Sequence, residues 1–144
     1  MNAHPHPICD VAAIARKYGH LTAGRHAADC AGRHEEMTQI DLLRTDLERQ
    51  ASLLVPTSAT GAAFLVALIS SAAAVIDGCE LIEPYETQYH ELIQRCTYRL
   101  AEYHRSMGAY LTPLVWAYHM PDYLDPVNPR VTSAAITDQQ QAAH

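Results

Sequence analysis

The alternation of apolar and polar residues is clearest between His34 and Leu54. Apolar side chains recur there every three or four positions, and polar or charged residues occupy most of the positions between them. This spacing places the apolar side chains on one face of an amphipathic helix. The stripe consists of Met37, Ile40, Leu43, Leu47, Ala51 and Leu54. Pro56 ends the helix, because the residue before a proline avoids helical backbone angles.

A second helix is predicted within a stretch that carries no charged side chain from Gln50 to Ile76. Thr57 or Ser58 is the expected N-cap, and Gly78 is the expected stop after Asp77. The helical wheel gives this segment two different faces. Its bulky face holds Phe64, Leu65, Leu68, Ile69, Val75 and Ile76, and its small face holds Ala59, Ala63, Ala67, Ser70, Ser71 and Ala74.

Residues 57–77 are long and apolar enough to span a membrane, which keeps a single-span membrane protein as one interpretation. A lone span in lipid is expected to be bulky and apolar all round, whereas a bundle helix has small residues where a second backbone comes close. We therefore favour a buried central helix that covers the apolar stripes of its two neighbours. The stripe Ala59, Ala63, Ala67 and Ser71 also suits a membrane dimer, so the span stays an alternative.

The third long helix begins at Pro84 and is predicted to reach about Leu111. Only a short connection separates it from the preceding helix, so the two are expected to be antiparallel neighbours. Its apolar stripe is Tyr85, Tyr89, Leu92, Ile93, Cys96, Leu100, Tyr103, Met107 and Tyr110. Tyrosine hydroxyls need hydrogen-bond partners or contact with solvent. This face is therefore expected to form a core that water partly reaches, an interface or the wall of a pocket.

Residues 1–33 are predicted to form a partly helical arm, with Asp10 as the N-cap of a short helix that Gly19 ends. Residues 113–144 are predicted to be a Pro-containing extension and a disordered tail, because three prolines exclude a regular helix and the end is polar. The predicted fold is therefore all-α. Its core is an antiparallel helical bundle of three main helices at 34–112, with the N-terminal helical arm before it and the irregular C-terminal tail after it.

Composition narrows the function classes. The formal charge of −6 disfavours binding to nucleic acid and to anionic membranes. The four cysteines form no C-x-x-C pair, and the start "MNAHPHPICD" lacks the features of a secretory signal. These observations favour a cytoplasmic protein with reduced thiols.

One candidate metal site comes from the tetrapeptide AGRH, which occurs twice with a cysteine between the copies. On a helix His26, Cys30 and His34 share one face, and imidazole with thiolate suits Zn²⁺. The outer pair would then be about 12 Å apart, too far to share one ion. We therefore expect surface histidines and a buried cysteine, and no metal, with zinc binding as the alternative.

Residues 11–28 resemble a degenerate helix-turn-helix, since Ile14, Ala15 and Gly19 match an apolar position, a small position and the turn glycine. His20 and Arg25 depart from that pattern, so DNA binding is a further alternative. Gly-rich phosphate loops and nucleophile elbows are missing from the sequence. We therefore expect no catalytic residue, no cofactor and no enzymatic activity.

The sequence "IDLLRTDLERQASLLVPTSATGAAFLVAL", residues 40–68, resembles small uncharacterised bacterial proteins. Those all-helical proteins consist of an amphipathic helix, a Pro-x-Thr/Ser turn and an Ala-rich helix that opens at a glycine. This chain departs from them in lacking charges after Gly61. The resemblance implies a helical fold and no known activity.

The three apolar stripes leave room for a fourth partner around the central helix. We therefore expect a non-enzymatic protein-interaction or regulatory module. Its partner is a second copy, forming a homodimer, or another protein that covers exposed apolar surface.

Overall fold

The computed structural model describes residues 10–109, 120 and 124–127 of the chain. This part contains four helices and no strand: α1 (Asp10–Cys30), α2 (His34–Ser52), α3 (Ala59–Gly78) and α4 (Tyr85–Ser106). The predicted all-α class is confirmed. The predicted division into three main helices and an arm is not confirmed, because α1 is as long as the other helices.

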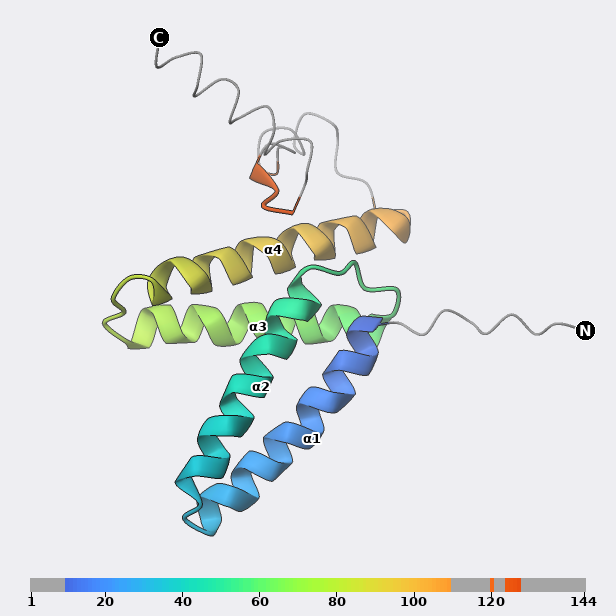
Figure 1. The fold of residues 1–144 in the computed structure, drawn as a ribbon. Coiled ribbons are helices and arrows are strands. Elements are labelled where there is room, and N and C mark those ends of the chain that lie inside the picture. The colour runs from blue at the N-terminus through green and yellow to red at the C-terminus, as the bar shows by residue number, and fades with distance from the viewer. Residues whose placement is uncertain (1–9, 110–119, 121–123, 128–144) are drawn as a thin grey trace, which may run out of the picture.

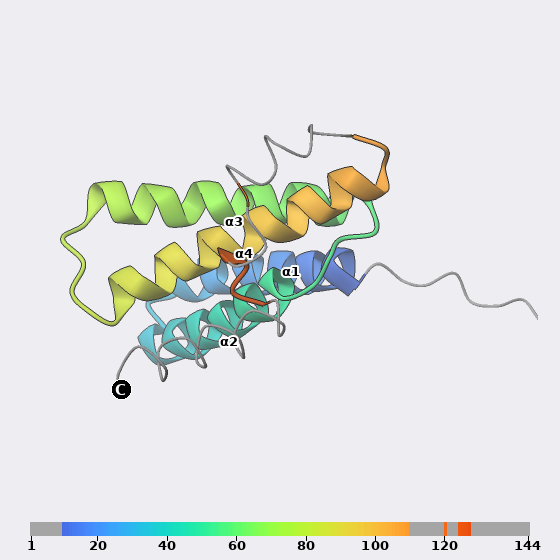
Figure 2. The same cartoon turned by 90° about the horizontal axis from the view of Figure 1, so that it is seen from above.

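The helices form two antiparallel hairpins, α1 with α2 and α3 with α4 (Figure 1). The N-terminal end of α1 and the C-terminal end of α2 lie against the second hairpin. The opposite end of the first hairpin, with the turn between α1 and α2, projects away from α3 and α4 (Figure 1). Viewed from above, α3 lies at the margin of the four helices (Figure 2).

Gly32 makes the turn between α1 and α2. It has a φ of +67°, a left-handed conformation that glycine adopts without the steric cost of a Cβ. The Gly32 amide donates to the Asp29 carbonyl at 3.0 Å, and the Arg33 amide donates to the Ala28 carbonyl at 2.9 Å. These two bonds satisfy carbonyls at the end of α1 in a Schellman arrangement. The chain is thereby reversed within a few residues, and α2 returns along α1.

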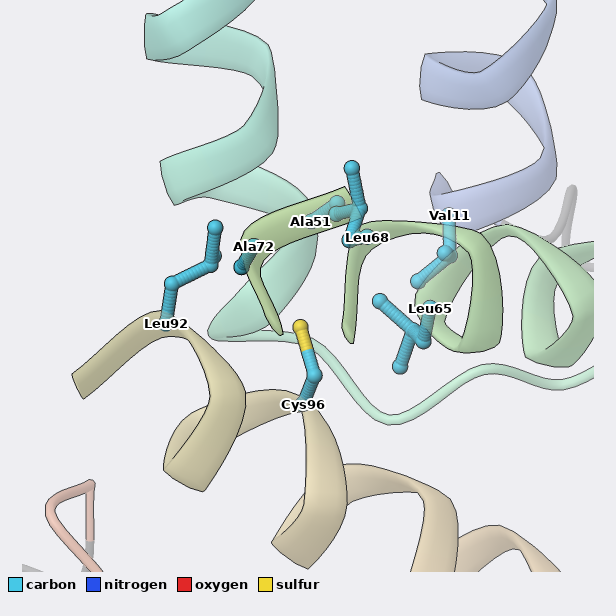
Figure 3. Packing of buried hydrophobic residues seen from close by; sticks show 7 residues of the cluster. All are labelled: Val11, Ala51, Leu65, Leu68, Ala72, Leu92 and Cys96. Carbon is cyan, nitrogen blue, oxygen red and sulfur yellow. The ribbon is translucent and has the colours of Figure 1, made fainter. Parts of the chain in front are cut away.

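All four helices contribute to the core. Its buried members are Val11, Ala51, Leu65, Leu68, Ala72, Leu92 and Cys96. Figure 3 shows Leu92 and Cys96 of α4 directed toward α3, and Val11 of α1 beside Leu65. Val11 is 1% exposed and Leu65 is fully buried. The start of α1 is therefore part of the core that the sequence assigned to residues 34–112.

The predicted helix end at Gly19 is wrong, because α1 continues without a break to Cys30. A glycine inside a helix costs about 1 kcal/mol relative to alanine, which the alanines around it and the packing on α2 outweigh. Since a helix-turn-helix needs a turn at this glycine, residues 11–28 do not form that motif.

The α2 stripe is largely as predicted. Ile40, Leu47 and Ala51 are buried, and Met37 is half-buried. Leu43 is the exception, with 55% of its surface exposed.

The fourth helix is shorter than predicted. It ends at Ser106, and Gly108 follows with a φ of +83°. Leu92 and Cys96 of its predicted stripe are buried, whereas Tyr85 and Met107 at the two ends are exposed. Tyr110, Trp116 and Tyr118 lie outside the described residues, as does most of the predicted tail.

Candidate interaction surface

The central feature of the candidate site is α3 itself. Ser58 is its N-cap, as predicted, and the Ser58 Oγ accepts a hydrogen bond from the Gly61 amide at 3.1 Å. Alanine-rich sequence then favours a continuous helix. After α3 ends at Gly78, the Cys79 amide donates to the Val75 carbonyl at 3.1 Å. Local sequence signals therefore determine where α3 begins and ends, and the helix carries no charged side chain before Asp77.

One side of α3 provides much of the core. Leu65, Leu68 and Ala72 are buried against the other helices, and Phe64 and Ile69 are half-buried beside them. These residues include most of the bulky face predicted from the wheel. The face is covered by α1 and α4 along most of its length and by α2 at fewer positions.

The opposite side is exposed along the whole helix. We call this surface the outer face of α3, and it comprises Ala59, Ala63, Val66, Ala67, Ser70, Ser71, Ala73 and Ala74. Val66 is its largest side chain and is 54% exposed. The prediction that α3 is covered on both sides is therefore wrong for the single chain. The two hairpins meet on the bulky side only, and α3 lies at the margin of the four helices (Figure 2).

The length and composition of α3 also satisfy the criteria for a membrane span, and it alone does so among the described helices. Only 28% of the apolar 18-residue stretch of α3 that meets these criteria is buried. A helix in the middle of a soluble core would be mostly buried. The low buried fraction of α3 therefore raises the question of what covers its exposed side. The two candidate explanations are a protein partner and a lipid environment.

A cleft of about 580 Å³ lies between α2 and the N-terminal half of α4. Its lining residues are Thr45, Glu48, Arg49, Leu53, Tyr85, Gln88, Tyr89, Glu91, Leu92 and Arg95. Two tyrosines of the predicted aromatic stripe, Tyr85 and Tyr89, therefore form part of a cleft wall. The volume lies within the range of small-molecule sites.

The charged groups of this cleft already have partners on the protein. Arg95 Nε donates to Ser52 Oγ at 2.9 Å, and Arg95 Nη1 lies 3.3 Å from Glu91. Arg49 Nη2 lies 3.0 Å from Asp46. Any charged ligand would have to compete with these contacts. The cleft is therefore lined mostly by polar residues, but its arginines are already bound to other protein groups.

The candidate zinc ligands are only partly brought together. Cys30 Sγ lies 3.8 Å from His26 Nε2 on the exposed side of α1. His34 begins α2 on the other side of the turn. Over residues 10–109, 120 and 124–127, His, Cys, Asp and Glu side chains form no group of three or more that could hold a metal ion. Cys30 is exposed, contrary to the expected buried cysteine.

Sequence reasoning missed a polar network between α1 and α2. The Tyr18 hydroxyl donates to Glu48 Oε1 at 2.7 Å and accepts from Arg44 Nη2 at 2.8 Å. The guanidinium of Arg44 also lies 4.7 Å from the centre of the Tyr18 ring. Burial, together with the bond to Glu48, raises the pKa of the Tyr18 hydroxyl. In the sequence Arg44 and Glu48 are charged residues off the apolar stripe of α2, and no local pattern predicts that they contact Tyr18.

A second missed feature joins α4 to the segment beyond it. Arg99 is nearly buried and forms an ion pair with Asp125, and Arg99 Nε lies 3.5 Å from Glu102. Gln94 donates to the Leu124 carbonyl at 2.8 Å. Residues 124–127 are thus attached to α4, within the region predicted to be loose.

Comparisons with protein-family models, curated protein sequences and solved structures gave no match. The resemblance of residues 40–68 to small bacterial helical proteins therefore stays a prediction.

Proposed function

We propose that this protein is a non-enzymatic interaction module that acts as a homodimer, with the outer face of α3 covered by a second copy. The exposure of that face is the observation that carries the proposal. Soluble monomers rarely expose extended apolar surface, and such surface usually marks an interaction site. Here it runs along a helix of 20 residues without a charged side chain before Asp77.

The small size of the exposed side chains supports a helix as the covering element. Alanine and serine let two backbones approach closely, so packing can extend along both helices. Burial of Val66 and the alanines between two copies would remove apolar area from water at roughly 25 cal/mol per Å².

A membrane-spanning α3 is the competing proposal, favoured by the low burial of that helix. It would require α3 to leave α1 and α4, which exposes Val11, Leu92 and Cys96 of the core. It would otherwise require α4 to enter the bilayer with Glu91 and Arg95, at a cost of several kcal/mol. Association of two intact chains needs neither change.

A pair of arginine substitutions tests the proposal. Ala63→Arg places a charge on the outer face, and Ala27→Arg makes the same change at an exposed position of α1. Both should leave the monomer fold intact, because both sites are exposed. Light scattering on a sizing column should give a monomer for the first variant and a dimer for the second. An Ala63→Arg protein that remains dimeric contradicts the proposal, and a wild-type protein that needs detergent supports the membrane alternative.

A further inference from the structure

Charges are unevenly distributed at the two ends of the outer face of α3. Asp77 lies at its C-terminal end and on the same side as Ala59, because 18 residues make five helical turns. Glu80 and Glu83 follow in the connection to α4, and both are exposed. This end of the face is therefore acidic.

The opposite end has no acidic side chain on α3 itself. The first turn of α3 carries the positive end of the helix dipole. Because α4 runs antiparallel to α3, its last turn, with Arg105, lies at this same end, and the first turn of α1, with Asp10, lies there too (Figure 1). Each protomer thus offers an uncharged strip with an acidic end and, at the other end, the positive end of the helix dipole.

We propose that two α3 helices pack antiparallel across a two-fold axis, an inference that rests on the proposed homodimer. A parallel pair would set Asp77 against Asp77 of the partner subunit and bring two acidic connections together, which is unfavourable. An antiparallel pair sets each Asp77 beside the positive end of the other α3 helix. Charge complementarity therefore selects a second copy as the occupant and fixes its direction.

The spacing of the exposed residues fits this arrangement. Positions recur at intervals of seven, with Ala59, Val66 and Ala73 in one row and Ala63, Ser70 and Asp77 in the next. A seven-residue repeat keeps the contact line facing the partner along a two-helix seam. With the axis at the level of Leu68, near the middle of α3, the two rows face each other, and Ala63 lies opposite Ala73 of the partner subunit.

Disulfide trapping distinguishes the two directions. In a background with Cys9, Cys30 and Cys79 replaced by serine, the buried Cys96 remains as an unreactive thiol. Two chains, one with Ala63→Cys and one with Ala73→Cys, are co-expressed with tags of different length and then oxidised. A disulfide forms only where the two Cα atoms lie within about 7 Å. The proposal predicts a cross-link between unlike chains, and little between like chains.

The controls separate this inference from the dimer itself. Each single variant is sized by light scattering before oxidation, and Ala27→Cys reports random collision. Strong self-cross-linking of Ala63→Cys would show a parallel dimer, which overturns the antiparallel inference and leaves the homodimer standing. A dimer with no cross-link between unlike chains also overturns it. A monomer at every concentration overturns both proposals.

Discussion

The ring of Tyr18 meets the ring of Phe64 edge to face, with centroids 5.2 Å apart. Tyr18 belongs to α1 and Phe64 to the half-buried flank of α3, while the hydroxyl of the same tyrosine donates to Glu48 of α2. A single side chain thus connects three helices. The first helix is held in place by this contact and by the buried Val11, which makes it a structural part of the fold.

Removing the Tyr18 hydroxyl should weaken the contact between α1 and α2 without separating the two helices. Tyr18→Phe keeps the ring contact and removes the hydrogen bonds to Glu48 and Arg44. We expect the free energy of unfolding to fall by about 1 kcal/mol, the typical net worth of such a bond. Urea denaturation measures the change, with Tyr85→Phe at an exposed position as the control. Equal effects of the two substitutions would show that the network contributes nothing.

Leu65 should be among the most sensitive core positions. It is fully buried among residues of the core cluster, so Leu65→Ala should leave a cavity and lower the free energy of unfolding by about 2 to 5 kcal/mol. Leu42→Ala is the matched control, since that leucine is 68% exposed on the projecting half of α2. The control should change stability by less than about 0.5 kcal/mol. Similar losses for both variants would contradict the described core.

Cys96 should remain unreactive in the folded protein. Burial raises the pKa of its thiol from 9.0 to about 12. Iodoacetamide at pH 8 should therefore modify the exposed Cys30 and Cys79 and spare Cys96 until denaturant is added. Peptide mapping by mass spectrometry identifies the modified thiols. Modification of Cys96 at the same rate as Cys79 would show that α4 does not bury it.

The same thiol gives a pH dependence with a defined sign. The unfolded chain ionises Cys96 near pH 9, whereas the folded chain does so only near pH 12. The unfolded state thus binds fewer protons in this window, and stability due to the thiol falls as the pH rises through it. The difference in unfolding free energy between wild type and Cys96→Ala should therefore shrink from pH 9 upward. A constant difference would contradict the raised pKa.

Asp125 should stabilise the protein through Arg99. Asp125→Ala leaves a nearly buried guanidinium with Glu102 as its remaining acidic neighbour, so we expect a loss of about 1 to 3 kcal/mol. Replacing Arg99 by methionine in the same chain removes the unpaired charge and should recover part of the loss. A double-mutant cycle measures this coupling. Strictly additive losses would mean that the two residues do not interact.

The sequence predicted three helices well because their apolar spacing, proline boundaries and caps are local signals. Ser58 was identifiable as an N-cap candidate by residue type and position alone. The continuation of α1 through Gly19 was not identifiable, because it depends on contacts such as Tyr18 with Phe64 that join distant parts of the chain. The pairing of Arg99 with Asp125 is likewise a tertiary contact that no local sequence pattern predicts.

The two faces of α3 were evident from the sequence, but their environments were not. The wheel separates Leu65 from Ala63 equally well for a central helix, a marginal helix and a membrane span. Which side is covered depends on how the two hairpins cross, and the residues of α3 that this crossing buries are those of the bulky side. The small side was expected to meet a neighbouring helix, and in the single chain it meets none of the described ones.

The most direct test of the central claim is the mass of the unmodified protein in detergent-free solution. Sedimentation equilibrium over a range of concentrations gives that mass independently of molecular shape. A homodimer with the outer face of α3 buried predicts twice the mass of one chain, with dissociation only on dilution. A stable monomer at all concentrations, with Val66 and its alanine neighbours permanently exposed, would contradict the claim.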